Sequence, residues 1–219
     1  WFPAWVRQHY AAVKLSLFAG ITLGVTALMV HANWVVNNPV ATHYSIHIPK
    51  KVAGRDSLTI VMMSDMHIGE MISNRLVRKY VALSNAQKPD LVVWVGDWLD
   101  YESLYAERAH VEEDLRALKA PLGVYAVNGN HEYRANRFAK YRWLQKTGAT
   151  LLIDSVAQPD STFYLIGRDD LVNKQRHGLQ SLLRGVDRSK PLIVLDHQPL
   201  SFSESVMNHI DLTLCGHTH

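Results

Sequence analysis

The sequence predicts an α/β fold in which short buried strands alternate with amphipathic helices, after one apolar N-terminal segment. Apolar runs of strand length recur from residue 58 onward, and segments with a helical spacing of apolar residues separate them. Polar side chains that can carry chemistry follow these runs where each strand would end. In layered α/β folds the carboxyl ends of the strands meet along one edge, where ligands bind. We therefore expect a functional crevice at that edge.

The apolar segment covers residues 15–36, about 22 residues, close to the roughly 20 that span a bilayer. Gly20 and Gly24 would let a second helix approach closely. Aromatic side chains typical of membrane interfaces flank the segment: Trp1, Trp5, Tyr10 and Trp34. A retained transmembrane helix is the main interpretation; a cleaved signal peptide and a buried soluble helix are the alternatives. The expected organisation is an anchor at 1–38 and a domain at 39–219, which places the protein at a membrane with undetermined sidedness.

Charge and cysteine content narrow the class of protein. The chain has 23 Lys and Arg against 20 Asp and Glu, and the basic residues are scattered, so no nucleic-acid binding is indicated. The single cysteine, Cys215, excludes an internal disulfide and is expected to be a small core residue. The sequence begins at Trp1 and stops at His219 inside a motif, so we expect further residues upstream and further strands downstream.

The apolar patterns place the secondary structure. Helical spacing predicts helices at 73–87, 104–118 and 134–147. Strands are expected at 42–48, 58–63, 91–95, 123–127, 151–153, 163–166, 192–195 and 212–214. In the first of these strands His43 and His47 share one face, and without a nearby carboxylate we expect them to face solvent.

Polar clusters after the strand-like runs are rich in ligands for divalent metals. Carboxylate, amide and imidazole groups suit ions that activate water and hold phosphate. The candidates are Asp65, His67, Asp97, Asn130, His197, His217 and His219. Any one of them is a weak signal, and ordinary turns would account for the glycines at 96, 129 and 216. Turns do not account for the histidines, so we expect a metal site.

The order and spacing of these clusters resemble those of the calcineurin-like metallophosphoesterase family over residues 58–219. The motifs that carry the resemblance are Asp65-x-His67, Gly96-Asp97-x-x-Asp100, Gly129-Asn130-His131-Glu132, His197 and Gly216-His217-x-His219. The resemblance implies a four-layer αββα sandwich with a dinuclear metal site, the metals being Mn, Fe or Zn. The first metal would be bound by Asp65, His67 and His219. The second would be bound by Asn130, His197 and His217, and Asp97 would bridge the two.

The same resemblance implies hydrolysis of a phosphodiester or phosphomonoester by a hydroxide that two metals activate. His131 would donate a proton to the leaving oxygen, and Asp100 would hold it. Glu132 would support the ligands without binding metal. A loop at 167–170 resembles a Gly-x-Asp-Asp loop of membrane-associated relatives, so Arg168 and Asp170 are candidates for substrate binding; a charged surface turn is the alternative.

Two other functions remain open at this point. One is a lipid-linked pyrophosphatase similar to the hydrolases of UDP-2,3-diacylglucosamine, for which an anchor would bring enzyme and substrate into one plane. The other is a binding scaffold of the same fold without catalysis, although none of the expected ligands is missing from the sequence.

Overall fold

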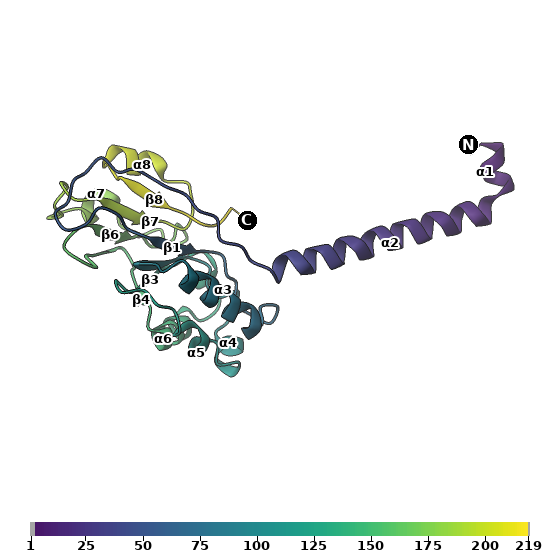
Figure 1. The fold of residues 1–219 in the computed structure, drawn as a ribbon, viewed down its shortest axis with the longest axis horizontal. Helices are drawn as coiled ribbons and strands as arrows, with labels where there is room; N and C mark the ends of the chain where they lie inside the picture. The colour runs from purple at the N-terminus through teal and green to yellow at the C-terminus, as the bar shows by residue number, and fades with distance from the viewer. Residues whose placement is uncertain (1–2, 219) are drawn as a thin grey trace. The chain divides into compact units, whose positions relative to one another are not determined.

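The computed structural model describes residues 3–218, and the chain divides into two compact units, residues 1–40 and 41–219. The first unit holds two helices, α1 (Ala4–Gln8) and α2 (Tyr10–Val36) (Figure 1). Helix α2 begins earlier than the sequence predicted and has no buried residue. Its 27 residues include an 18-residue window with a mean hydropathy of 1.9, so the helix is long and apolar enough to cross a membrane. A signal sequence near the N-terminus would have the same properties.

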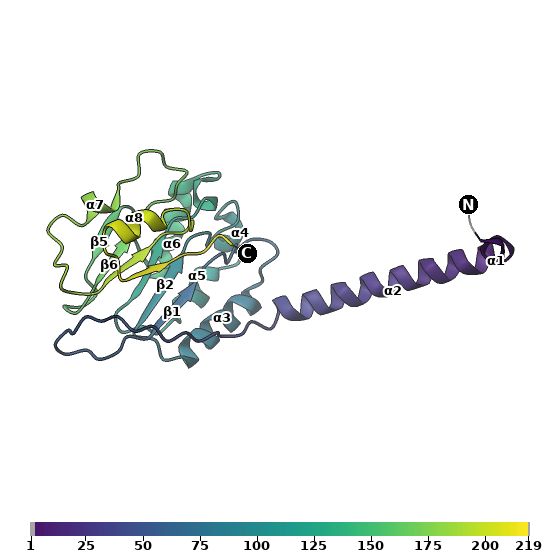
Figure 2. The same cartoon turned by 90° about the horizontal axis from the view of Figure 1, so that it is seen from above.

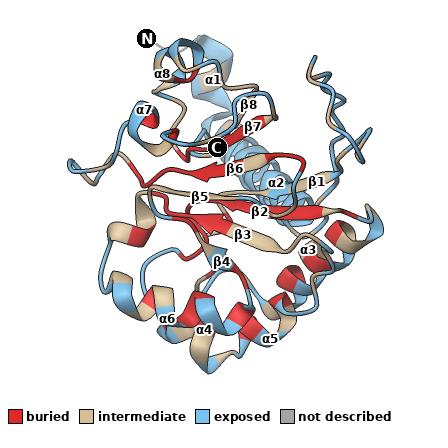
Figure 3. Ribbon diagram, turned by 90° about the vertical axis from the view of Figure 1, so that its left-hand side faces the viewer, coloured by how far each residue is buried: buried red, intermediate tan, exposed pale blue. Residues whose placement is uncertain are grey.

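The second unit begins its regular structure with a parallel sheet. Its strands are β1 (Ile60–Met63), β2 (Leu91–Val95), β3 (Val124–Val127) and β4 (Thr150–Leu151), in that spatial order. The helices between them are α3 (Asn74–Ala86), α4 (Leu104–Arg108), α5 (Val111–Leu115) and α6 (Arg137–Thr147), after the short 3₁₀ helix η1 (His131–Tyr133). Figure 3 shows that these helices lie on one side of the sheet, and Figure 2 shows the same cartoon from above.

A second sheet packs on the other side of the first. It contains β5 (Ser155–Ala157), β6 (Tyr164–Gly167), β7 (Leu192–Leu195) and β8 (Leu212–Leu214). Only the β5–β6 pair is antiparallel. Helices α7 (Leu179–Leu182) and α8 (Phe202–Met207) lie on its outer side (Figure 3).

Successive side chains of a strand point to opposite faces of its sheet, and this alternation explains the layers. In β2 the side chains of Val92 and Trp94 join the core beneath α3 to α6, whereas Leu91, Val93 and Val95 join the core between the two sheets. Strand β7 divides its side chains in the same way, between the inter-sheet core and the core beneath α7. Each fully buried aliphatic side chain contributes roughly 1.5–3 kcal/mol, so both faces of these strands are fixed. The expected four-layer αββα sandwich is confirmed.

Three sequence predictions need correction. Residues 42–48 form no strand, and all of them except the partly buried Ile48 are exposed. The segment is instead held at its end by Lys50, whose Nζ lies 2.6 Å from Asp211 Oδ2. His43 and His47 are exposed, as expected. The helix predicted at 104–118 is interrupted, because His110 has a left-handed backbone with φ of 51° between α4 and α5. Cys215 is partly buried just after β8 rather than a fully buried core residue.

Candidate metal centre

The candidate ligands lie on loops that leave the carboxyl ends of β1, β2, β3, β7 and β8. Backbone hydrogen bonds join these loops directly. The His67 amide donates to the Asp97 carbonyl at 3.0 Å, and the Gly216 amide donates to the His197 carbonyl at 2.9 Å. Residues distant in the sequence are therefore brought together at one edge of both sheets.

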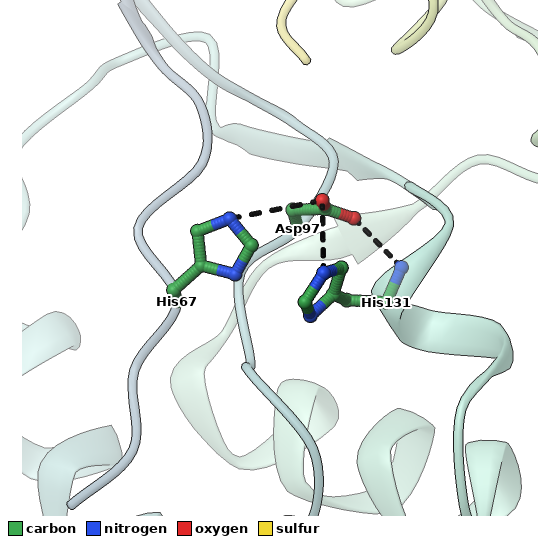
Figure 4. Close-up of side chains that lie close together, drawn as sticks. All are labelled: His67, Asp97 and His131. Atoms are coloured by element: carbon green, nitrogen blue, oxygen red, sulfur yellow. Dashed lines mark hydrogen bonds and ion pairs between the residues drawn. The ribbon is translucent and has the colours of Figure 1, made fainter. Parts of the chain in front are cut away.

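Asp97 is the common member of two groups that could each hold a metal ion. One group is His67, Asp97 and His131 (Figure 4), and the other is Asp97, His197 and His217. In each group the ligand atoms lie within 4.8 Å of one another. The Asp97 carboxylate is almost fully buried, and its Oδ1 accepts a hydrogen bond from the His131 amide at 2.8 Å. Burial raises the pKa of Asp97, but hydrogen bonds and the charges of His197 and His131 outweigh this and lower it.

The residues around Asp97 fit a divalent cation. Among the described residues, Asn130 Oδ1 and His197 Nε2 are buried and have no hydrogen-bond partner, although His197 Nε2 lies 3.3 Å from Asp97 Oδ2. A buried polar group left without a hydrogen bond costs roughly 1–3 kcal/mol. The Nδ1 of His197 lies 2.8 Å from the Val95 carbonyl, which fixes the ring and leaves Nε2 to face the site. Burial lowers the pKa of His197, but Asp97, the Val95 carbonyl and Asp65 raise it to about 9. The same negative surroundings favour a bound cation.

Four candidate ligands have a left-handed backbone. The φ angles are 53° at Asp65, 42° at His67, 51° at Asp97 and 73° at His217. This conformation is uncommon for residues other than glycine and costs on the order of 1–3 kcal/mol. Such strain gathers at functional sites, and here it directs imidazoles and carboxylates toward one point.

Two glycines let the strand ends approach each other. Gly96 has φ of 80°, and a Cβ there would overlap the His197 ring. Gly129 does not have a positive φ, but a Cβ there would overlap the Asp97 carboxylate. Turn formation therefore accounts for Gly96 only in part, and close packing around Asp97 accounts for Gly129.

His131 lies beside Asp100, the residue expected to hold it. Its Nδ1 is 2.6 Å from the Asp100 carbonyl oxygen and 3.2 Å from the Asp100 carboxylate. The ring meets that of His67 edge to face, with centroids 4.4 Å apart. Donation from Nδ1 to Asp100 leaves Nε2 directed toward the Asp97 side, 4.0 Å from Oδ2.

Glu132 is buried and joins two of the loops. Its carboxylate accepts hydrogen bonds from the amides of Asp97 at 2.8 Å, Leu99 at 3.3 Å and Gly129 at 2.7 Å. Burial, followed by the charge of Asp97, raises the pKa of Glu132 to about 7. All these contacts are with backbone groups, so Glu132 is placed to support the loops.

The chain matches the family model of calcineurin-like phosphoesterases over residues 58–219. It belongs to this family. A Caenorhabditis elegans putative metallophosphoesterase is 32% identical over 83% of this chain and 40% of its own length. An Aquifex aeolicus metallophosphoesterase is 31% identical over 80% of this chain and 68% of its own length. A Danio rerio transmembrane protein with a metallophosphoesterase domain is 31% identical over 83% of this chain and 44% of its own length.

Family membership indicates an enzyme that hydrolyses phosphoester bonds and uses divalent metals. The chain spans less than half the length of two of these three relatives. Among solved structures, a Pseudomonas putida nuclease MPE aligns with 62% of this chain and 59% of its own, at 16% identity and a TM-score of 0.36. That likeness is too low to support an argument.

In this phosphoesterase the two expected substrate-binding residues are buried among protein partners. Arg168 is 2% exposed, and its Nη1 lies 2.6 Å from Glu204 Oε2 and 3.5 Å from Asp196 Oδ2. Asp170 is 1% exposed and accepts hydrogen bonds from Gln198 Nε2 at 3.0 Å. The alternative of a charged surface turn is wrong, and the Arg168 guanidinium is already occupied by two carboxylates.

Of the remaining site residues, one lies outside the described part of the chain and two were not revealed by the sequence. His219, expected to bind the first metal, lies outside the described residues. Asn128 and Tyr133 were missed, although they flank the motif at 129–132 and contact Asp169. Their position next to the motif was the only signal in the sequence, because their partner lies in the other sheet.

Proposed function

We propose that this protein hydrolyses a phosphodiester or phosphomonoester at a centre of two divalent metals. The observation that carries the proposal is that Asp97 belongs to both groups of ligand atoms. The first metal would be held by Asp65, His67 and His219. The second would be held by Asn130, His197 and His217, with Asp97 between the two.

The ligand types support Mn, Fe or Zn, because imidazole suits transition metals and disfavours Ca²⁺. Two such ions, when bound, would supply a nucleophile at neutral pH and offset negative charge on the phosphoryl oxygens. The chain's own residues hold this centre: Glu132 ties the Asp97 loop to the Gly129 loop, and the His197 ring is fixed by the Val95 carbonyl.

His131 is the proposed proton donor to the leaving oxygen. Its contacts with Asp100 orient the ring and direct Nε2 toward the Asp97 side. A positioned general acid contributes roughly 10²–10⁴-fold to a reaction whose leaving group is a poor one.

Helix α2 is the proposed membrane anchor. Its length, hydropathy and exposed side chains support this, as do relatives named transmembrane proteins. Finding residues 1–40 in the mature protein in a carbonate-washed membrane fraction would support the anchor. Recovery of a soluble protein cleaved near residue 32 would instead establish a signal peptide.

Metal content and turnover of the full-length protein test the proposed reaction. The metal-free protein is loaded with Mn²⁺, and hydrolysis of an activated phosphodiester is compared with and without the metal. Two bound ions and metal-dependent turnover are expected. Two ions without turnover of small esters, but with turnover of a lipid-linked pyrophosphate, would establish the alternative substrate class. No bound metal would refute the proposal and favour the scaffold.

A further inference from the structure

Asp169 is a buried carboxylate that sits between the two sheets. It follows β6 in the second sheet and is 1% exposed. Asn128 Nδ2, at the end of β3 in the first sheet, donates to its Oδ1 at 2.8 Å. The Tyr133 hydroxyl and Asn173 Nδ2 both donate to its Oδ2. The carboxylate therefore connects elements that no strand pairing joins.

The two first-sheet partners of Asp169 stand on either side of the motif at 129–132. Asn128 precedes it and Tyr133 follows it, so one carboxylate holds both ends of the loop that carries Asn130 and His131. The Asn128 amide is itself fixed, because its nitrogen also donates to the Tyr141 hydroxyl in α6 at 2.8 Å. Its two N–H groups are thus both used.

Asp169 is held in turn by the crossover between the sheets. Its amide donates to Asp154 Oδ1 at 2.9 Å, and Asp154 lies between β4 and β5, the last strand of one sheet and the first of the other. Asp154 Oδ2 also accepts from the His177 amide at 2.8 Å. The backbone of Asp169 is therefore held in place by hydrogen bonds, so its carboxylate can position the loop.

The site needs such a link because the ligands proposed for the second metal come from both sheets. Asn130 follows a strand of the first sheet, and His197 follows a strand of the second. The sheets meet through an apolar core, and apolar packing is not directional. Hydrogen bonds to a buried carboxylate are directional and can fix the distance between the two loops.

We propose that Asp169 is a positioning residue that holds the loop at 129–132 against the second sheet, and so places Asn130 opposite His197. The inference rests on the proposed two-metal function, and it assigns Asp169 a part in holding the second metal rather than in binding substrate. Loss of a group that orients a metal ligand lowers metal affinity roughly 10–100-fold. The effect should fall mainly on the second metal, because the loop that Asp169 holds carries Asn130, whereas His67 lies on the loop after β1.

The test is a Mn²⁺ titration of metal-free wild-type, Asp169→Asn and Asp211→Asn proteins, with metal content and thermal unfolding measured in parallel. Asp211 is the matched control: its carboxylate accepts from Lys50 Nζ at 2.6 Å and from the Leu192 amide at 2.8 Å, at the opposite ends of β7 and β8. Asp169→Asn should keep one tight ion and weaken the other by roughly 10–100-fold. Asp211→Asn should keep both ions tight even if it unfolds at a lower temperature.

Tyr133→Phe removes one hydroxyl and keeps the proposal testable if Asp169→Asn fails to fold. It should weaken the same ion by a smaller factor, and adding it to Asp169→Asn should change little, because both remove one interaction. Two ions bound as tightly as in the wild type by either single variant, or equal weakening of both ions, would overturn the role of Asp169. A wild-type protein that binds fewer than two ions would instead overturn the proposed function itself.

Discussion

The two sides of Asp97 differ in how far the protein satisfies its own polar groups. On the side of His67 and His131, both rings lie within ion-pair distance of Asp100, at 3.6 Å and 3.2 Å. On the other side, Asn130 Oδ1 and His197 Nε2 are buried and have no hydrogen-bond partner among the described residues, although His197 Nε2 lies 3.3 Å from the Asp97 carboxylate. The first side is ordered by protein contacts, whereas the second is complete only when a ligand is bound. The difference predicts distinct responses to mutation on each side.

The largest effect is expected from Asp97→Ala, which removes the carboxylate common to both sides. Both metals should be lost. The rate constant kcat should fall roughly 10³-fold or more, which corresponds to a loss of several kcal/mol of transition-state stabilisation. Elemental analysis of the purified protein together with a turnover assay would check this. Near-normal metal content would show that Asp97 does not bridge the two groups.

On the ordered side, His131→Ala should retain metal and lose turnover by roughly 10²–10⁴-fold for substrates with poor leaving groups. Activated esters, whose leaving oxygen needs no proton, should be much less affected. Hydrolysis rates of the variant and the wild type would be compared for a series of aryl and alkyl esters. Equal losses across the series would exclude a proton-donor role.

The two sides should also differ in their tolerance of one added methyl group. Gly96→Ala would press a Cβ into the His197 ring at a positive φ, which costs roughly 1–3 kcal/mol and should weaken metal binding. Gly69→Ala is the matched variant on the ordered side, where the nearest atom to the new Cβ is Asp100 Cβ at 3.3 Å. Calorimetric metal titrations of both variants would measure the loss of metal affinity in each. Equal losses of affinity would show that the two sides tolerate the added methyl group equally.

The smallest and most specific effect concerns the free energy of unfolding. Asn130→Leu removes a buried acceptor that has no hydrogen-bond partner among residues 3–218, so the metal-free variant should be about as stable as the wild type or up to about 1 kcal/mol more stable. The stabilisation that added metal gives the wild type should shrink in the variant. Denaturant unfolding with and without Mn²⁺ measures both quantities. A metal-free variant that is clearly less stable would mean that Asn130 has a structural role.

Much of the fold could be predicted because buried strands are continuous apolar runs. Leu91–Val95, Leu192–Leu195 and Leu212–Leu214 have the bounds that the sequence indicated. The prediction failed at residues 42–48, which alternate in polarity but do not pair with a strand of either sheet. Strand β5 was missed because its three residues are too few to give a pattern.

The candidate site was predictable only as far as strand ends indicate it. Asp97 and His197 each follow an apolar strand, so their convergence could be expected from an α/β fold. The partners of Arg168 could not, because Asp196 and Glu204 meet it only after the second sheet and α8 have packed. The link from Asn128 to Asp169 depends on the separation of two sheets, which no local pattern encodes.

The left-handed backbone at Asp65, His67, Asp97 and His217 sets a limit on how the protein can be engineered. Glycine adopts this conformation at no steric cost, whereas aspartate and histidine do not, so the fold by itself would be better served by glycine at these positions. Substitutions chosen for thermal stability alone would therefore tend to remove the ligands first. A thermostable variant that keeps its chemistry must gain its stability elsewhere, for example in the cores on the two faces of β2.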